Sequence, residues 1–201
     1  VFGQSALFGG GQWLGIPDHD DWDFAGDFCI DFRANIHSLA NSHAVFIDAS
    51  SSPRIGIYYY HPSNVLYAFG FSFPWTPSLD TWYHVAVTRN GSDLRVFIDG
   101  QQIGSTQALS GTVYGSSLYI GAAFNMTVPL YGWMDEIRIS NGTARWIANF
   151  TPPVSPYGSV GGLDAYTKLL LHLDGNLSDS SGNHHDFSAN GTVSFSASPE
   201  K

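Results

Sequence analysis

Carboxylates are the groups with which this chain could most readily do chemistry, yet their arrangement does not suit catalysis. Hydrolysis of a glycosidic bond needs two carboxyl groups about 5–10 Å apart, one of them kept protonated. Glutamate occurs only at Glu136 and Glu200, far apart in the chain. The chain also lacks the Gly-x-Ser-x-Gly nucleophile elbow, a phosphate-binding loop and the His-Glu-x-x-His zinc motif. We therefore predict that the protein is not an enzyme and has no catalytic residues.

One aspartate, Asp135, stands on a strand among large apolar residues. Alternation with period 2 would place it on the same face as Tyr131, Trp133, Ile137 and Ile139. A carboxylate on an apolar face needs a partner, because burying its charge alone is costly. The candidate partners are a cation, backbone N–H groups and the side chain of Arg138.

The other clusters of polar residues favour solvated loops over metal sites. Segment 17–23 holds four aspartates (Asp18, Asp20, Asp21 and Asp23), but their spacing matches no defined metal loop. Segment 174–183 lacks the glycine at position six and the terminal glutamate of a calcium loop. The histidines are scattered, and only His184 and His185 are adjacent.

Aromatic side chains beside polar groups are candidates for binding sugars. A sugar can pack against an aromatic ring while neighbouring polar groups bind its hydroxyls. The candidate carbohydrate-binding residues are Trp22, Tyr58, Tyr60, His61 and Trp75. The alternative is that these rings belong to the core.

Asparagine is concentrated in Asn-x-Ser/Thr sequons. Some of these positions are explained by turns, where Asn-Gly is favoured. The excess nevertheless predicts a glycosylated surface protein. The candidate glycosylation sites are Asn90, Asn125, Asn141, Asn149, Asn176 and Asn190.

Composition narrows the class of protein and its partners. The formal net charge is −9, which disfavours nucleic-acid binding because phosphate backbones would repel the chain. No apolar run approaches the length of about 18 residues that a membrane span needs, so no membrane partner is expected. The single cysteine, Cys29, excludes an internal disulfide and is expected to be a buried, inert thiol.

The elements that must position these residues are short strands. Period-2 alternation recurs along the chain, most clearly at 28–36, and Asn90-Gly91 indicates a hairpin turn. Segment 65–73 has the pattern of one strand, and only 142–149 resembles a helical turn. We predict an all-β fold, a two-sheet antiparallel sandwich of the jelly-roll type. The expected core includes Phe28, Ile30, Phe32, Val85, Val87, Val96, Ile98, Ile120, Ile137 and Ile139.

Three segments resemble the concanavalin A-like lectin/glucanase superfamily, and within it laminin-G-like jelly rolls of surface and phage virion proteins. They are SALFGGGQWLGIPDHDDWDFAGDFCIDF at 5–32, TWYHVAVTRNGSDLRVFIDGQQIGS at 81–105 and LYGWMDEIRISNGTARWIANFTPP at 130–153. The resemblance implies Ca²⁺ as a cofactor, with Asp135 as a ligand and backbone carbonyls from around Gly26 and Asp174 completing the site. The Glu-x-Asp-x-Glu motif of the catalytic relatives is missing.

The order of the segments differs from the family pattern. A strand like KLLLHLDGNLSDSSGN (168–183) normally opens the domain, whereas here it comes last. We predict a jelly roll at 1–157, a linker at 158–167, and a segment at 168–201 that completes a jelly roll. The chain is then a circular permutant, one period of a tandem repeat, or a protomer whose last segment completes its neighbour. The order favours the neighbour, and hence copies of the chain as partners in a head-to-tail fibre or array.

The function expected from these features is that of a non-enzymatic structural or adhesion module at an extracellular or virion surface. The alternative is a calcium-dependent lectin domain, whose partners would be glycans.

Overall fold

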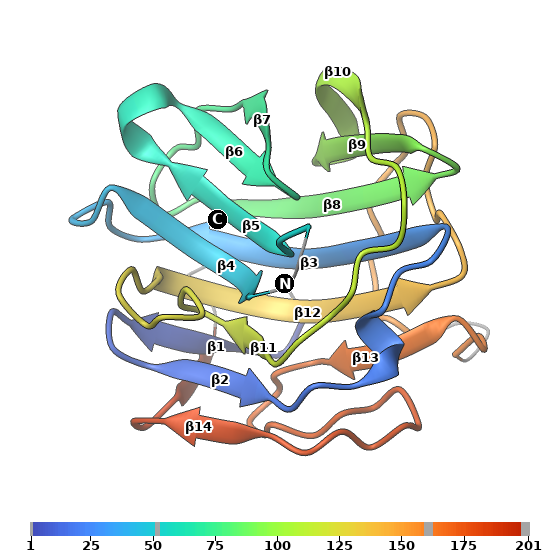
Figure 1. Ribbon diagram of the computed structural model, residues 1–201. Helices are drawn as coiled ribbons and strands as arrows, with labels where there is room; N and C mark the ends of the chain where they lie inside the picture. The colour runs from blue at the N-terminus through green and yellow to red at the C-terminus, as the bar shows by residue number, and fades with distance from the viewer. Residues whose placement is uncertain (1, 51–52, 159–162, 198–201) are drawn as a thin grey trace.

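A computed structural model describes residues 2–50, 53–158 and 163–197 and consists of two antiparallel sheets packed face to face (Figure 1). One sheet has the order β10-β9-β8-β3-β12-β1-β15, and β13 also pairs with β12. Its strands are β1 (Gln4–Gly9), β3 (Phe28–Ile36), β8 (Trp82–Asn90), β9 (Asp93–Ile98), β10 (Gln101–Ala108), β12 (Tyr131–Asn141), β13 (Thr167–Leu171) and β15 (Ser194–Ala197).

The second sheet has seven strands in the order β14-β2-β11-β4-β5-β6-β7. They are β2 (Trp13–Ile16), β4 (His43–Ala49), β5 (Gly56–Tyr60), β6 (Val65–Ala68), β7 (Phe71–Pro74), β11 (Leu118–Ile120) and β14 (Ser188–Asn190). Among the described residues, helix is limited to two 3₁₀ turns, η1 (Asp20–Trp22) and η2 (His61–Ser63). The predicted all-β sandwich is confirmed.

The core lies between the two sheets, where alternate side chains from both meet. All ten predicted core residues are at most 8% exposed. Cys29 is also fully buried, and burial raises the pKa of its thiol well above the ordinary value. The prediction of a buried thiol is confirmed.

Two local predictions were wrong. Segment 65–73 forms two strands, because Phe69 and Gly70 both adopt positive φ and turn the chain into a tight hairpin. Leu66 and Ala68 therefore face the core, and Tyr67 points outward. Segment 142–149 is not helical: it follows β12 as an irregular loop in which Trp146 and Phe150 stack on each other.

The C-terminal segment completes the jelly roll of its own chain. β13 pairs with β12, β15 with β1, and β14 with β2, so that β14 runs beside β2 in Figure 1. Leu169, Leu171 and Leu173 enter the common core. The segment order favoured docking onto a neighbouring copy, but in this structure the segment docks onto its own chain. The reason is that β13 finds its pairing partner, β12, within the same chain. The predicted linker falls partly on 159–162, which lie outside the described residues.

None of the helical turns within the described ranges is long and apolar enough to span a bilayer.

Candidate functional site

A β-bulge in β12 determines where its charged residues point. The register of β12 against β3 shifts between Asp135 and Arg138, and Glu136 has a φ of 50°, unusual for a residue with a side chain. Ile137 and Ile139 consequently turn into the core, whereas Asp135 does not. The prediction that Asp135 shares one face of the strand with Ile137 and Ile139 was wrong, because the bulge reverses the alternation of side chains after Asp135.

Arg138 forms an ion pair with Asp31 and not with Asp135. Its guanidinium donates from Nε (3.0 Å) and Nη2 (2.9 Å) to the two oxygens of Asp31, which is fully buried. Burial opposes ionisation of Asp31, but the charge of Arg138 and hydrogen bonds from His84 and Arg138 hold the pKa of this carboxyl below its ordinary value. His84 in turn hydrogen-bonds the Tyr157 hydroxyl at 3.0 Å. Arg138 thus binds both oxygens of Asp31, which makes this carboxylate structural, whereas the buried Nδ1 of His84 has no hydrogen-bond partner among the described residues.

Asp135 is partnered by the N-terminal backbone instead. Its Oδ2 accepts a hydrogen bond from the Phe2 N–H at 3.0 Å. Its Oδ1 is buried and has no hydrogen-bond partner among the described residues. Burial raises the pKa of Asp135 to about 7; the Phe2 N–H opposes this shift, and the charges of Glu136 and Asp174 add to it. An orphaned carboxylate oxygen of this kind suits either a proton or a cation.

Asp174 and Glu136 lie close enough to influence Asp135 electrostatically. Asp174 accepts a hydrogen bond from the Gln4 N–H at 2.6 Å and helps line a cavity of about 380 Å³ together with His172. The two oxygens of Glu136 are occupied by His172 Nδ1 (2.7 Å) and the Tyr157 N–H (2.8 Å). Among these groups, the oxygens of Asp135 and Asp174 fit the hard-oxygen preference of Ca²⁺.

Gly26 does not belong to this site. β12 and β3 pair Asp135 with Arg33 and Asn141 with Phe28. Gly26 therefore lies roughly 20 Å along the strand direction from Asp135, at about 3.3 Å per residue. The expectation that a carbonyl near Gly26 completes a calcium site with Asp135 was wrong, because β3 runs antiparallel to β12 and Gly26 precedes β3, at the end far from Asp135.

Aromatic side chains gather on the outer face of the seven-stranded sheet. Tyr58 and Tyr60 of β5 point away from the core, on the face opposite to Ile57 and Tyr59. Tyr58 stacks on Tyr67 of β6, with ring centroids 5.0 Å apart and planes at 19°, and Tyr60 packs against His43 of β4 at 4.7 Å. We call His43, Tyr58, Tyr60 and Tyr67 the aromatic platform. All four side chains are half-buried, so part of each is accessible to solvent.

Charged groups border the platform. Arg54 lies over the Tyr58 ring, 5.8 Å from its centroid, and forms a bidentate ion pair with the fully buried Asp48. Asp48 also accepts a hydrogen bond from the Phe124 N–H at 2.9 Å. The guanidinium is therefore fixed beside the tyrosines, and its remaining donors can bind a hydroxyl-rich ligand.

A second concave surface lies where the loops near β2, β4 and β12 meet. A cavity of about 470 Å³ there lies within the range of small-ligand sites. Its lining includes two aromatic rings, Trp13 and Tyr131, and two amides, Asn41 and Asn190. None of these four residues was predicted as a sugar contact, since they come together only through strand pairing and docking of the C-terminal segment.

The five predicted carbohydrate-binding residues do not form one site. Tyr58 and Tyr60 lie together on the platform, but Trp22 is fully buried in the core, so its proposed contact with a sugar was wrong. His61 is exposed in η2, and Trp75 is half-buried with its ring edge-on to Tyr59 and Tyr83. Tyr67 and His43 were not among the predicted residues. Cross-strand register could have identified them, because they lie opposite Tyr58 and Tyr60.

The six sequon asparagines lie in loops or at strand ends. Five are exposed: Asn90, Asn125, Asn149, Asn176 and Asn190. Asn141 is half-buried, and its amide donates to the backbone carbonyls of Asp21 and Asp23 at 3.1 and 3.0 Å. A glycan at Asn141 would have to disrupt these bonds, which makes it the least suited of the six.

The family model described as the concanavalin A-like lectin/glucanases superfamily, Laminin_G_3, matches residues 8–146. The chain therefore belongs to this family, and it has a laminin-G-type jelly roll. No curated protein matches the chain.

Similar solved structures share the fold at low sequence identity. Domains LG4-5 of the mouse laminin alpha1 chain are 11% identical (TM-score 0.53), over 76% of this chain and 48% of that one. Domain 4 of AbnA, an extracellular GH43 arabinanase from Geobacillus stearothermophilus solved with arabinotriose, is 16% identical (TM-score 0.53), over 70% and 71%. A Trypanosoma rangeli sialidase is 17% identical (TM-score 0.46); the match covers 57% of this chain and only 20% of the sialidase.

Proposed function

We propose that the protein is a non-catalytic carbohydrate-binding module that works outside the cell, with the aromatic platform as its binding surface. The observation that carries the proposal is the clustering of three tyrosines and a histidine on the outer face of a sheet, where packing of the core does not require them. Part of each ring is accessible, and tyrosine presents an apolar face with a polar tip.

The chemistry of the platform suits sugars. The C–H faces of a pyranose or furanose ring can pack on tyrosine, while the tyrosine hydroxyls, the imidazole of His43 and the guanidinium of Arg54 supply hydrogen bonds to its hydroxyl groups. The arabinanase domain solved with arabinotriose supports this proposal by analogy of fold.

The carboxylates support a binding role over catalysis. The two carboxylate oxygens of Glu136 are hydrogen-bonded to His172 and to the Tyr157 N–H. Asp31 forms an ion pair with Arg138. Asp135 has a raised pKa, as a general acid would, but its side chain is fully buried and cannot reach a polysaccharide.

Calcium enters the proposal as a structural ion. Asp135 and Asp174 would hold it at the junction of the N-terminal backbone and the segment after β13, where it would neutralise two neighbouring carboxylates. Its place in the fold is distant from the platform, so we expect Ca²⁺ to stabilise the domain without contacting the sugar.

A glycan array tests the proposal. The protein is applied with Ca²⁺ and again with a chelator, beside a Tyr58→Ala/Tyr60→Ala double variant and a Tyr114→Ala control, which removes a tyrosine that is 63% exposed and outside the platform. We expect the parent and the control to bind the same glycans and the double variant to lose at least about tenfold in affinity.

An array on which the folded parent binds nothing would contradict the proposal. The structural or adhesion role expected from the sequence, with the chain as a unit of a surface or virion array, would then be the better account.

A further inference from the structure

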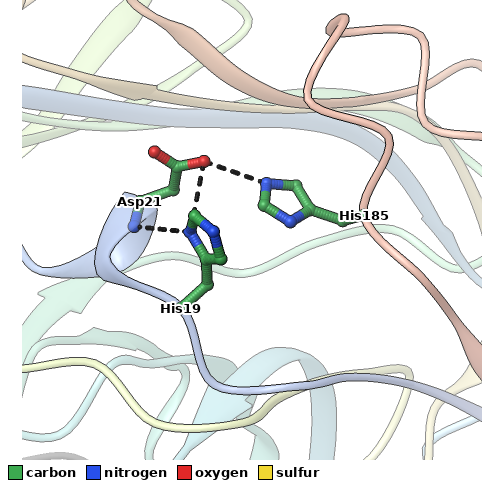
Figure 2. A group of neighbouring side chains, drawn as sticks. All are labelled: His19, Asp21 and His185. Carbon is green, nitrogen blue, oxygen red and sulfur yellow. Dashed lines mark hydrogen bonds and ion pairs between the residues drawn. The ribbon is translucent and has the colours of Figure 1, made fainter.

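Two histidines and an aspartate from opposite ends of the chain converge at one edge of the sandwich. Figure 2 shows His19 and Asp21, at the start of η1, facing His185 from the C-terminal segment. The Oδ2 atom of Asp21 lies 3.0 Å from His185 Nε2 and 3.3 Å from His19 Nδ1. One ligand atom from each residue lies within 4.8 Å of the other two.

The two separations measured from Asp21 match those between ligands on one metal ion. Zinc is bound tetrahedrally at about 2.0–2.2 Å by imidazole nitrogen and carboxylate oxygen, so two ligand atoms on the same ion stand roughly 3.3 Å apart. Two imidazoles and one carboxylate form a ligand set for Zn²⁺ and related transition metals, whereas Ca²⁺ prefers six to eight oxygens. The cluster thus differs in chemistry from the proposed calcium site.

The surroundings fix the three side chains in place. The backbone N–H of His185 donates to Asp179 Oδ2 at 3.0 Å. The His185 ring packs on the ring of buried Trp22, with centroids 4.7 Å apart. His19 Nδ1 accepts the Asp21 N–H at 3.1 Å, which turns its ring toward the cluster. A metal ion would take the place of this bond and of the proton shared by His185 and Asp21.

The site is also open to solvent. The side chain of His19 is 52% exposed, whereas those of Asp21 and His185 are 18% and 9% exposed. A metal ion can therefore enter past His19 and keep a water molecule as its fourth ligand, as zinc does where the protein supplies only three.

We propose that His19, Asp21 and His185 form a site for Zn²⁺ or a similar transition-metal ion, and that this ion clamps the C-terminal segment onto the jelly roll. The cluster joins residues that are 164 positions apart in the chain. Two of the ligands belong to the loop that follows β2, and the third stands just before β14. Binding therefore stabilises the docked segment relative to any state in which it is released.

The test is calorimetric titration of the chelator-treated protein with Zn²⁺, in the absence and in the presence of excess Ca²⁺. We expect one Zn²⁺ per chain and no competition from Ca²⁺. His19→Ala, Asp21→Asn and His185→Ala should each weaken Zn²⁺ binding by at least about tenfold. His184→Asn is the matched control: His184 is adjacent, exposed and has positive φ, which asparagine tolerates, and it should bind as the parent does.

Hydrogen exchange of β14 gives a second readout. Zn²⁺ should slow exchange at 188–190 in the parent and in His184→Asn, but not in His185→Ala. Co²⁺ should give the intense visible absorption of a four-coordinate site in the same two proteins. The proposal is overturned if folded parent protein takes up no Zn²⁺ at 100 µM, or if the three ligand variants bind it as the parent does.

Discussion

At the scale of single residues, Asp135 shows how a backbone irregularity creates a candidate site. The bulge at Glu136 turns Ile137 and Ile139 into the core and leaves Asp135 buried beside the N-terminal backbone, with one oxygen bound to Phe2 and the other unpartnered. Sequence alone indicated that Asp135 needs a partner. It could not indicate that Arg138 is already bound to Asp31, because that contact depends on the register of β12 against β3, which the bulge shifts.

The raised pKa of Asp135 predicts a particular dependence of stability on pH. Its pKa is about 7 in the folded protein and about 3.9 when unfolded. The folded state thus binds the extra proton between these values, so the stability due to this group is present below pH 4 and lost as pH rises to 7. The loss is of the order of 4 kcal/mol, because each pKa unit corresponds to about 1.4 kcal/mol.

Urea unfolding of the parent and Asp135→Asn across pH 4–8, in chelator, measures this effect. The profile of the variant should lack that decline, since asparagine does not titrate. Adding Ca²⁺ at pH 7.5 should then stabilise the parent and not the variant. Parallel pH profiles for the two proteins would show that Asp135 does not titrate in this range.

At the scale of the elements, the strands and the core could be predicted from the sequence. Burial of one face of a sheet makes every second residue of a strand apolar, and this alternation is visible in the sequence. Every predicted core residue is buried, and the turn at Asn90-Gly91 joins β8 to β9. The hairpin at Phe69-Gly70 was missed, since aromatic residues on both sides of it continued the alternation. The platform was half predicted: Tyr58 and Tyr60 follow from one strand, but Tyr67 and His43 require the cross-strand register.

The C-terminal segment makes a further prediction at this scale. Leu171 of β13 is fully buried and pairs with Ile137 of β12. Leu171→Ala should cost about 2–5 kcal/mol, because it leaves a cavity in a core built from distant parts of the chain. Val154→Ala, at a side chain that is 86% exposed, should change stability by less than about 0.5 kcal/mol.

Equilibrium urea denaturation of both variants provides the comparison. A loss of less than 1 kcal/mol for Leu171→Ala would mean that β13 is not docked in solution as it is here. Size-exclusion chromatography of the same samples would show whether the segment then pairs with a second copy.

At the scale of the whole molecule, the sandwich separates its tasks. The N-terminal strand, the segment after β13 and the acidic groups of β12 meet at the proposed calcium site, and the platform lies on the outer face of the other sheet. The proposed zinc cluster joins the loop after β2 to the C-terminal segment. In this proposal the metal ions hold the two ends of the chain in place, and the aromatic platform binds the ligand.

The central claim is that the platform binds carbohydrate, and chemical-shift mapping tests it most directly. The ¹⁵N-labelled protein is titrated with the glycan that binds most strongly on the array. The account predicts saturable shifts concentrated on β4, β5 and β6, around His43, Tyr58, Tyr60 and Tyr67. Shifts confined to other surfaces, such as the cavity beside Trp13 and Tyr131, or no shifts at millimolar glycan, would contradict it.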